Sequence, residues 1–235
     1  MPDGAILVTG ANRGIGAAIA TELAASGRSV AGLTRSGTSA AGDGYVCDLA
    51  EEGAIARAVA AVAARGPIAG LVNNAGIYAA HVSAELTAAE FDRIMRINAT
   101  SVLVAARQVY PHLKRAGGGL IVNIGSYYDK LGVAKTVAYC ASKAAVGAIT
   151  RCLAVEWAAD NIRVLDLAPG YIATELNAAF RAREATQRWI AETIPGGRAG
   201  NPQEIGRLVA MLFSCEVSYL TGETIYVDGA LGIKH

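Results

Sequence analysis

The chain of 235 residues has no marked excess of charge of either sign. It contains 21 lysine and arginine residues against 20 aspartate and glutamate residues, which gives a formal net charge of +1. This balance provides no electrostatic reason to expect a nucleic acid or an anionic membrane as a partner. No stretch approaches the roughly 18 uncharged apolar residues of a membrane span, so none is expected.

Cysteine and histidine are scarce and scattered. The cysteines are Cys47, Cys140, Cys152 and Cys215, and the histidines are His81, His112 and His235. No two cysteines form a Cys-x-x-Cys pair, so we expect buried free thiols in a reducing, cytoplasmic compartment rather than disulfides. No histidine cluster has the spacing of a zinc site, and we expect no metal.

The sequence also lacks internal repeats, low-complexity tracts and linkers. Hydrophobic residues make up 53% of it, which argues against disorder, and its length suits one large α/β domain over residues 1–235. Asp3 lies near the N-terminus, directly before the apolar run Ala5–Val8. A cleavable signal would remove the Gly-rich segment that follows this run, so we expect none.

Short apolar runs alternate with Ala-rich segments of helical character. The expected strands are Ala5–Thr9, Ser29–Thr34, Gly44–Val46, Gly70–Asn73, Leu120–Ile124, Arg163–Leu167 and Thr224–Val227. The expected helices are Ile15–Ser26, Glu51–Ala64, Ala88–Arg115, Val137–Ala159, Glu175–Glu192 and Pro202–Phe213. This alternation predicts parallel strands joined by right-handed crossovers, in a sheet that is covered on both faces. The segment Arg35–Tyr45 is too short and too rich in glycine for a helix, so a loop should replace one crossover there.

Three helix starts carry capping signals. Thr87 and Glu90 have the spacing of a capping box, and Asp48 and Glu51 have the same spacing. Asn201-Pro202 places a capping residue before a proline at the first helical position.

The segment Thr9-Gly10-Ala11-Asn12-Arg13-Gly14-Ile15-Gly16 lies between an apolar strand and an Ala-rich helix. Glycines at this spacing permit a tight turn and a close approach of the backbone to a diphosphate. The helix that follows directs its free N–H groups and the positive end of its dipole at such an anion. The segment therefore indicates a dinucleotide site. An ordinary Gly-rich turn is the alternative, and the segment alone does not separate the two.

Two Tyr-x-x-x-Lys pairs occur, Tyr139–Lys143 and Tyr110–Lys114. In a helix, each pair lies one turn apart on one face. Tyr110 precedes a proline near a helix end, and no serine at a strand end precedes it at useful range, so we interpret it as structural. Tyr139 follows Ser126 by 13 residues, and Ser126 lies just after an apolar strand. The carboxyl ends of strands are where open α/β sheets bind ligands.

Together these residues resemble the short-chain dehydrogenase/reductase superfamily, and within it the 3-oxoacyl-(acyl carrier protein) reductase-like group. The resemblance extends from Thr9 to Asp228. It rests on the Gly-rich segment and on Asn73-Asn74-Ala75-Gly76, Asn98, Ser126, Tyr139-x-x-x-Lys143 and Pro169-Gly170. It implies a single-domain Rossmann-type α/β fold, with a doubly wound parallel sheet of seven strands flanked by helices. Residues 1–125 would mainly bind the cofactor, and residues 126–235 would mainly carry catalysis and bind substrate.

The resemblance implies an enzyme that transfers a hydride between a nicotinamide and a ketone or secondary alcohol. Tyr139 would be the general acid and base, and the Lys143 ammonium would lower its pKa from the ordinary value of about 10. Lys143 would also bind the nicotinamide ribose, and Ser126 would hold the substrate oxygen. Asn98 would support a water-mediated proton relay; alternatively, it kinks or caps a helix.

The resemblance also implies a set of cofactor contacts. They are Gly10, Asn12, Arg13, Gly14, Ile15, Gly16, Arg35, Asp48, Leu49, Asn74, Ala75, Gly76, Tyr139, Lys143, Pro169, Gly170, Ile172 and Thr174. Asp48 would contact adenine, cap a helix, or do both. Thr174 would bind the carboxamide or cap a helix.

The second strand ends in Leu33-Thr34-Arg35-Ser36, without the acid that would accept the ribose 2′-OH of NAD. Arg35 suits a 2′-phosphate, and Arg13 adds a second cation. We therefore expect NADP(H) rather than NAD(H). Two solvated surface arginines are the alternative reading.

Substrate identity is weakly encoded. The segment Tyr127–Lys130 follows Ser126 and should lie at the mouth of the pocket, together with Tyr78, His81, Tyr171 and the lid-like segment Leu176–Thr193. Asp129 and Lys130 permit a polar or charged substrate. Three further cations could meet an anionic carrier or simply solvate a helix face: Arg181, Arg183 and Arg188.

Members of the family commonly form tetramers, and we expect a homotetramer that packs through Ala88–Arg115, Val137–Ala159 and Tyr226–Gly229. Three other functions remain open. They are an NAD(H)-dependent alcohol or sugar dehydrogenase, a nucleotide-sensing regulator without turnover, and a sugar-nucleotide epimerase or dehydratase. The last resembles longer chains with a separate substrate lobe.

Overall fold

A computed structural model describes residues 3–215 and 217–234 of the protein. Seven strands form one sheet in the order β3-β2-β1-β4-β5-β6-β7, and every neighbouring pair is parallel. The strands are β1 Ala5–Thr9, β2 Ser29–Thr34, β3 Asp43–Val46, β4 Ile68–Asn73, β5 Gly119–Ile124, β6 Ile162–Pro169 and β7 Thr224–Val227. The order reverses at β1 and β4, which makes the sheet doubly wound and confirms the expected fold class.

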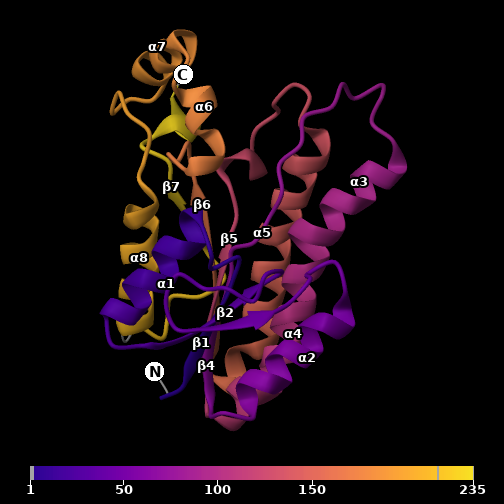
Figure 1. The fold of residues 1–235 in the computed structure, drawn as a ribbon, viewed down its shortest axis with the longest axis vertical. Coiled ribbons are helices and arrows are strands. Elements are labelled where there is room, and N and C mark those ends of the chain that lie inside the picture. Colours follow the sequence, from indigo (N-terminus) through magenta and orange to yellow (C-terminus); the bar gives the residue numbers. More distant parts are fainter. Residues whose placement is uncertain (1–2, 216, 235) are drawn as a thin grey trace.

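Helices cover both faces of this sheet (Figure 1). The helices are α1 Gly14–Ala25, α2 Glu52–Ala63, α3 Ala88–Met95, α4 Ser101–Arg115, α5 Val137–Trp157, α6 Ala178–Arg181, α7 Glu184–Thr193 and α8 Pro202–Ser214. Helices α1 and α8 lie on one face, and α2, α4 and α5 on the other. The short helices α6 and α7 rise beyond the sheet edge at which the strands end (Figure 1).

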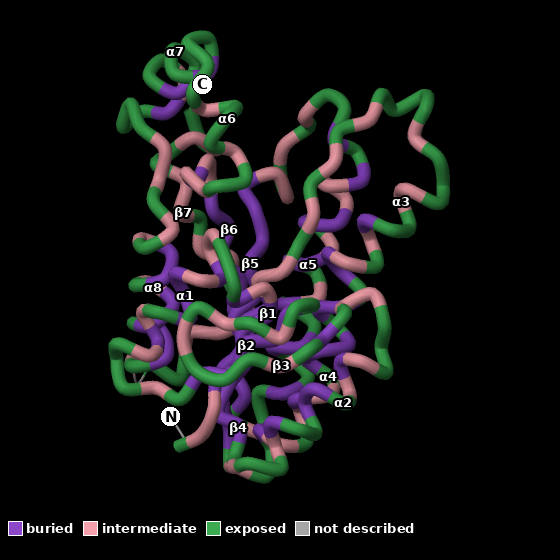
Figure 2. The backbone as a smooth tube through the Cα atoms, viewed as in Figure 1, coloured by how far each residue is buried: buried purple, intermediate pink, exposed green. Residues whose placement is uncertain are grey.

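The two helix layers create two apolar cores, one on each face of the sheet. Successive strand residues point to opposite faces, so Leu7 belongs to the same core as Val109 of α4, whereas Val8 belongs to the same core as Val209 of α8. The central strands are accordingly buried along their length, while the segment around α6 and α7 is largely exposed (Figure 2). The segment around α6 and α7 thus lies exposed at the carboxyl edge of the sheet, where ligands are bound in such folds.

A loop replaces the crossover helix between β2 and β3, as the sequence predicted. It packs so closely on β2 that a Cβ on Gly32 would lie 2.5 Å from the Ser39 Cβ atom. The backbone N–H of Ala40 donates to the Ala11 carbonyl at 3.0 Å, which ties this loop to the Gly-rich segment.

Two expected helices are interrupted. The segment Ala88–Arg115 is divided into α3 and α4 by a π-helical turn over Arg96–Thr100. The segment Glu175–Glu192 begins with a 3-10 turn and breaks before Glu184, because Arg183 has an extended backbone (φ −72°, ψ 132°). The π-helical turn contains Asn98, whose hydrogen bonds are described below.

The three predicted caps have different outcomes. Thr87 Oγ1 accepts the Glu90 N–H at 3.2 Å, so it caps α3, although the Glu90 carboxylate binds Arg93 instead of completing the box. The box of Asn201 with Glu204 forms at the start of α8. The prediction that Asp48 caps a helix is wrong.

Helix α2 begins at Glu52 with Glu51 as its N-cap residue, whose side chain makes no capping hydrogen bond. The Asp48 carboxylate instead accepts the Ala50 N–H at 2.9 Å. This local bond, from a side chain to a backbone N–H two residues on, closes a turn that precedes the helix.

The four cysteines are free, as expected, but only Cys47 is buried and Cys152 is exposed. Among the residues described, no helix combines the length and apolar character needed to cross a membrane. Within the same residues, no three histidine, cysteine or acidic side chains gather into a possible metal site.

Candidate active site

The predicted site residues meet at the carboxyl edge of the sheet. The Gly-rich segment follows β1, Asn74–Gly76 follows β4, Ser126 follows β5 and Gly170 follows β6. Because all strands are parallel, these four segments lie at one edge although the sequence separates them widely.

The geometry of the Gly-rich segment fits a bound diphosphate. Gly10 and Gly14 have positive φ angles of 70° and 56°, and a Cβ on Gly16 would stand 2.2 Å from the Gly10 carbonyl oxygen. The first turn of α1 contains no acid, and no side chain caps it at Arg13. Its N–H groups and dipole are therefore open to an anion. The residues present thus fit the phosphates of a dinucleotide.

Thr9 holds the ends of β1 and β4 together. Its Oγ1 accepts the backbone N–H groups of Asn74 and Ala75 at 2.9 and 3.0 Å, and Asn74 Nδ2 donates to the Thr9 carbonyl at 2.9 Å. The expected contacts did not include Thr9 itself. A hydroxyl at the last strand position before the first glycine was the signal in the sequence.

Arg13 and Arg35 are exposed on this side of the molecule. Neither forms an ion pair with another residue in the ranges described. Beyond Arg35, the Ser36 and Thr38 hydroxyls lie 2.7 Å apart. The end of β2 thus presents cations and hydroxyls but no carboxylate, which is the donor set that suits a phosphate.

The segment after β6 reaches across to the Gly-rich segment. A Cβ on Gly14 would stand 3.7 Å from the Thr174 Cγ2 atom. Asn177 shapes this segment, because its Nδ2 donates to the Ile172 carbonyl at 2.8 Å and its Oδ1 accepts the Thr174 N–H at 3.0 Å. Thr174 therefore lies both at a helix start and over the nucleotide segment, so its two expected roles are compatible. Asn177 falls within the lid-like segment Leu176–Thr193 that the sequence predicted, but it was not singled out there.

Lys143 lies on α5 with its side chain buried at the end of β5. Its Nζ donates a hydrogen bond to the Ile124 carbonyl at 2.8 Å. Burial lowers the pKa of Lys143 to about 8, and the field of Asp166 partly opposes that shift. The ammonium is thus held in place by a backbone oxygen two residues before Ser126.

Tyr139 lies one turn before Lys143, and its hydroxyl is near enough to the Ser126 side chain for Ser126 to affect its pKa. Burial raises the pKa of Tyr139 to about 12, and the nearby Ser126 side chain partly opposes this shift. The expected lowering by Lys143 is therefore wrong for this structure. The Lys143 ammonium stands 5.8 Å from the centre of the Tyr139 ring and is directed at the Ile124 carbonyl.

Asn98 lies in the π-helical turn and is buried. Its amide donates to the Ser142 Oγ atom at 3.1 Å, next to Lys143 in the sequence. It also forms two hydrogen bonds with the backbone of Ile77, beyond β4. The turn thus directs one polar side chain toward two other segments of the site, and π-helical turns are frequent at functional sites.

Aromatic rings surround the Tyr139 side chain. The rings of Tyr78 and Tyr128 meet it edge to face, with centroids 5.1 and 5.8 Å away. Tyr171 packs in the same manner on Trp189 of α7, at 5.6 Å. Several residues expected at the mouth of the pocket are therefore near the candidate acid or on the helix above it.

Other residues expected at the mouth are held by local partners. His81 Nε2 lies 3.3 Å from Glu90 Oε1. The Asp129 carboxylate accepts the Tyr226 hydroxyl at 2.8 Å, and Lys130 Nζ lies 3.5 Å from the centre of the same ring. The loop after Ser126 is thereby attached to β7.

Tyr110, in the second Tyr-x-x-x-Lys pair, has structural partners. Its hydroxyl donates to Asp160 at 2.7 Å, and its ring stacks on Trp157 at a centroid distance of 4.7 Å. Lys114 also pairs with Asp160, at 3.1 Å. The structural interpretation is consistent with these contacts, which tie α4 to the end of α5.

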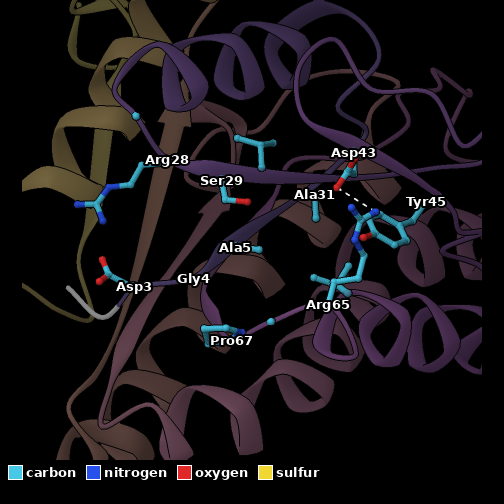
Figure 3. A pocket seen from close by; sticks show the side chains of 14 residues that line it. Asp3, Gly4, Ala5, Arg28, Ser29, Ala31, Asp43, Tyr45, Arg65 and Pro67 are labelled. Atoms are coloured by element: carbon cyan, nitrogen blue, oxygen red, sulfur yellow. Dashed lines mark ion pairs between the residues drawn. The ribbon is translucent and has the colours of Figure 1, made fainter.

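A cavity of about 400 Å³ lies away from this site, at the amino ends of the strands (Figure 3). Arg28 and Asp3 lie toward one end of it, and Asp43 and Arg65 pair at 3.1 Å near the other. None of the predicted site residues lines it. A smaller cavity of about 270 Å³ lies at the carboxyl edge beside Tyr171, Ile172 and Asp228.

Known proteins of similar sequence and structure cover nearly the whole chain. The family model described as enoyl-(acyl carrier protein) reductase matches residues 10–231. The 3-oxoacyl-(acyl-carrier-protein) reductase MabA of Mycobacterium bovis is 36% identical, over 98% of this chain and 93% of that protein. Galactitol 2-dehydrogenase (L-tagatose-forming) of Cereibacter sphaeroides is 38% identical, over 94% and 92%. The crystal structure of a gluconate 5-dehydrogenase from Burkholderia cenocepacia, in complex with NADP and tartrate, matches with a TM-score of 0.92 at 32% identity, over 100% of this chain and 97% of that one.

Proposed function

The chain belongs to the short-chain dehydrogenase/reductase family, and from this premise we propose that it is an NADP(H)-dependent oxidoreductase acting on a ketone or secondary alcohol. The observation that carries the proposal is the meeting of Ser126, Tyr139 and Lys143 beside an open, uncapped Gly-rich segment. A hydride donor bound on that segment would lie next to a proton donor. This is the pair of groups that carbonyl reduction requires.

In this mechanism the nicotinamide, when bound, supplies or accepts the hydride. Ser126 and Tyr139 hold the substrate oxygen with their hydroxyls, and Tyr139 transfers the proton to or from it. Because burial raises the pKa of Tyr139 to about 12, its phenol stays protonated near neutral pH. A protonated phenol is the form that donates a proton when a ketone is reduced.

Lys143 and Asn98 complete the mechanism. The ammonium of Lys143 is anchored on the Ile124 carbonyl, and its other N–H bonds are available for a ribose hydroxyl and for stabilising charge that develops on Tyr139. Asn98 holds the backbone at Ile77 and donates to Ser142, and in this proposal it supports a proton relay to the site.

NADP(H) is favoured over NAD(H) by the charge pattern at the end of β2. Arg35 and Arg13 offer guanidinium groups, and no acid stands where a ribose hydroxyl would need one. The relative from Burkholderia cenocepacia, with NADP in its crystal structure, supports the same nucleotide.

A small-molecule substrate suits the site better than a large anionic carrier. The three arginines of the segment above the site each have a partner within this segment. Arg181 Nε donates to Asn177 at 3.0 Å, Arg188 pairs with Glu184 at 2.8 Å, and Arg183 lies over the Phe180 ring. These contacts favour the interpretation that the arginines stabilise the segment and face solvent.

The test is a panel of ketones with NADPH and of secondary alcohols with NADP, followed by absorbance at the nicotinamide band. Tyr139→Phe should lower turnover at least about 100-fold, because it removes only the proton-donating hydroxyl. Tyr110→Phe is the matched control, since the same substitution in the other Tyr-x-x-x-Lys pair should leave turnover unchanged. Unchanged turnover in Tyr139→Phe would eliminate the proposed acid.

We also propose that the protein is a cytoplasmic homotetramer. Apolar side chains are exposed on both long helices, including Leu103 of α4 and Val155 of α5, which is 80% exposed. A second copy of the chain would cover them. The four free thiols suit a reducing compartment.

A further inference from the structure

A row of polar side chains crosses the sheet just before its carboxyl edge. Asn73, Asn123, Asp166 and Thr224 occupy paired positions on β4, β5, β6 and β7. Asn73 donates to Asn123 at 2.9 Å, Asn123 donates to Thr150 of α5 at 2.9 Å, and Thr224 donates to Asp166 at 3.2 Å. We call these four residues the polar row; Asp166 is its only ionisable member.

Asp166 is fully buried, and its carboxylate is incompletely satisfied. Its Oδ2 accepts the Thr224 hydroxyl, whereas its Oδ1 has no hydrogen-bond partner among the described residues. Two glycines make room for it. A Cβ on Gly125 would stand 2.5 Å from Oδ1, and one on Gly147 would stand 4.0 Å from Oδ2. Burying a carboxylate without full pairing is costly, so this one requires an explanation beyond packing.

The surroundings of Asp166 connect it to Lys143. Gly147 lies one helical turn after Lys143 on α5, so both face the sheet at the same place. On the other side, Gly125 directly follows Ile124, whose carbonyl accepts the Lys143 ammonium. The carboxylate thus stands between the segment that holds Lys143 and the strand end that anchors it.

Among the described residues, few other charged or titratable groups face this pair. Tyr226 of β7 lies in the field of Asp166. Asp129 lies on the loop after Ser126 and acts on Asp166 by repulsion. Arg151 of α5 approaches Gly147, with its Nη1 atom 3.4 Å from where a Cβ would stand. Lys143 is the buried cation of the set, and opposite charges interact most strongly where water is excluded.

We propose that Asp166 is a positioning residue, whose negative charge keeps Lys143 protonated and its ammonium directed at the Ile124 carbonyl. The proposal rests on the proposed function in one respect, because it takes Lys143 to be part of the reaction. Asp166 itself touches neither substrate nor nucleotide in this assignment. It acts through Lys143 alone.

The pH dependence of this effect follows from the two groups. Burial raises the pKa of Asp166 to about 6, so its charge is present above pH 6 and is lost below it. The field of this charge raises the pKa of Lys143 against the effect of burial. Without the carboxylate, Lys143 loses its proton at a lower pH, and the ammonium is absent over a wider alkaline range.

The experiment compares the wild type with Asp166→Asn, which keeps the shape of the side chain and removes its charge. NMR titration of the lysine ε-carbons should show the Lys143 midpoint at least half a pH unit lower in the variant. The pH at which kcat/KM for carbonyl reduction falls in alkaline solution should be lowered with it. The two proteins should differ severalfold at pH 8 and converge below pH 6, because the wild-type carboxyl is then neutral.

Thr224→Val is the control, since it removes a hydrogen bond from the polar row and leaves the charge of Asp166. In this variant the titration midpoint of Lys143 and the alkaline fall of kcat/KM should match those of the wild type. An unchanged Lys143 midpoint in Asp166→Asn, or a loss of activity equal at all pH values, would overturn the proposal. The NMR titration requires no turnover. It therefore separates this outcome from a failure of the proposed function, which Tyr139→Phe tests.

Discussion

The side chain of Asn98 binds the backbone of Ile77 in both directions. Its Oδ1 accepts the Ile77 N–H at 2.8 Å, and its Nδ2 donates to the Ile77 carbonyl at 2.9 Å. Each backbone group of Ile77 thus gains a partner that a strand would otherwise provide. The π-helical turn directs Asn98 toward Ile77, so a local irregularity in one helix shapes the loop beyond β4.

Asn98→Ala should damage both the fold and the site. It leaves the Ile77 N–H and carbonyl without partners, which should lower the free energy of unfolding by about 3 kcal/mol and reduce turnover. Denaturant unfolding and steady-state kinetics measure the two effects. Asn201→Ala at the start of α8 is the control, with an expected cost of about 1 kcal/mol and no change in turnover. Full activity in Asn98→Ala would show that Asn98 only accommodates the π-helical turn.

Carbonyl reduction should lose rate in alkaline solution. The pKa of Lys143 is lowered to about 8, so the ammonium is present below pH 8 and is lost above it. Tyr139, with its pKa raised to about 12, stays protonated over the same range. We expect kcat/KM for NADPH, which reports the free enzyme, to be level from pH 6.5 to 7.5 and to fall with a midpoint near 8. A rate that rises steadily through pH 8 would contradict this assignment.

Replacing Arg35 should change the preference for the nucleotide. Loss of a guanidinium from a 2′-phosphate removes a charge-assisted bond of about 1.5–3 kcal/mol, so Arg35→Ser should raise the KM for NADPH roughly 10- to 100-fold. The KM for NADH should stay unchanged. Arg65→Ser, at the opposite edge of the sheet (Figure 3), is the control and should alter neither value. Comparable kcat/KM with both nucleotides in the wild type would exclude the proposed specificity.

A charge on the exposed face of α5 should disrupt the proposed assembly. Val155 is 80% exposed, so Val155→Asp adds a carboxylate without disturbing the core of one chain. Sedimentation at micromolar concentration should show a tetramer for the wild type and smaller species for the variant. Glu192→Asp on α7 is a conservative control and should leave the assembly intact. A wild type that sediments as a monomer would refute the proposal.

Local patterns predicted much of this structure. Seven apolar runs, of which Ala5–Thr9 is the first, predicted the seven strands that the structure contains. The glycine content of Arg35–Tyr45 predicted a loop in place of a crossover helix, and the structure has a loop there. Apolar runs and glycine content are properties of neighbouring residues, so they can be read without the fold. For the same reason, the segments that carry Ser126, Tyr139 and Lys143 could be singled out from their spacing.

The predictions that failed depended on contacts between distant segments. The interruption at Asn98 depends on the backbone of Ile77, which belongs to another element. The direction of the Tyr139 pKa shift depends on burial by Tyr78 and Tyr128, and no pattern around Tyr139 itself contains that information. The prediction for Asp48 failed for a different, local reason, because its side chain binds the backbone N–H of Ala50 and not that of a helix.

The sequence by itself determined the alternation of strands and helices, the parallel sheet and the Gly-rich segment, because periodicity and glycine placement act over a few residues. Only the tertiary structure decided which side chains share an environment. Strand register placed Asp166 in line with Asn123 and Thr224, and helix packing placed Lys143 above them. The charge of a buried group depends on such neighbours and on the loss of water around it, and these exist only once the chain has folded.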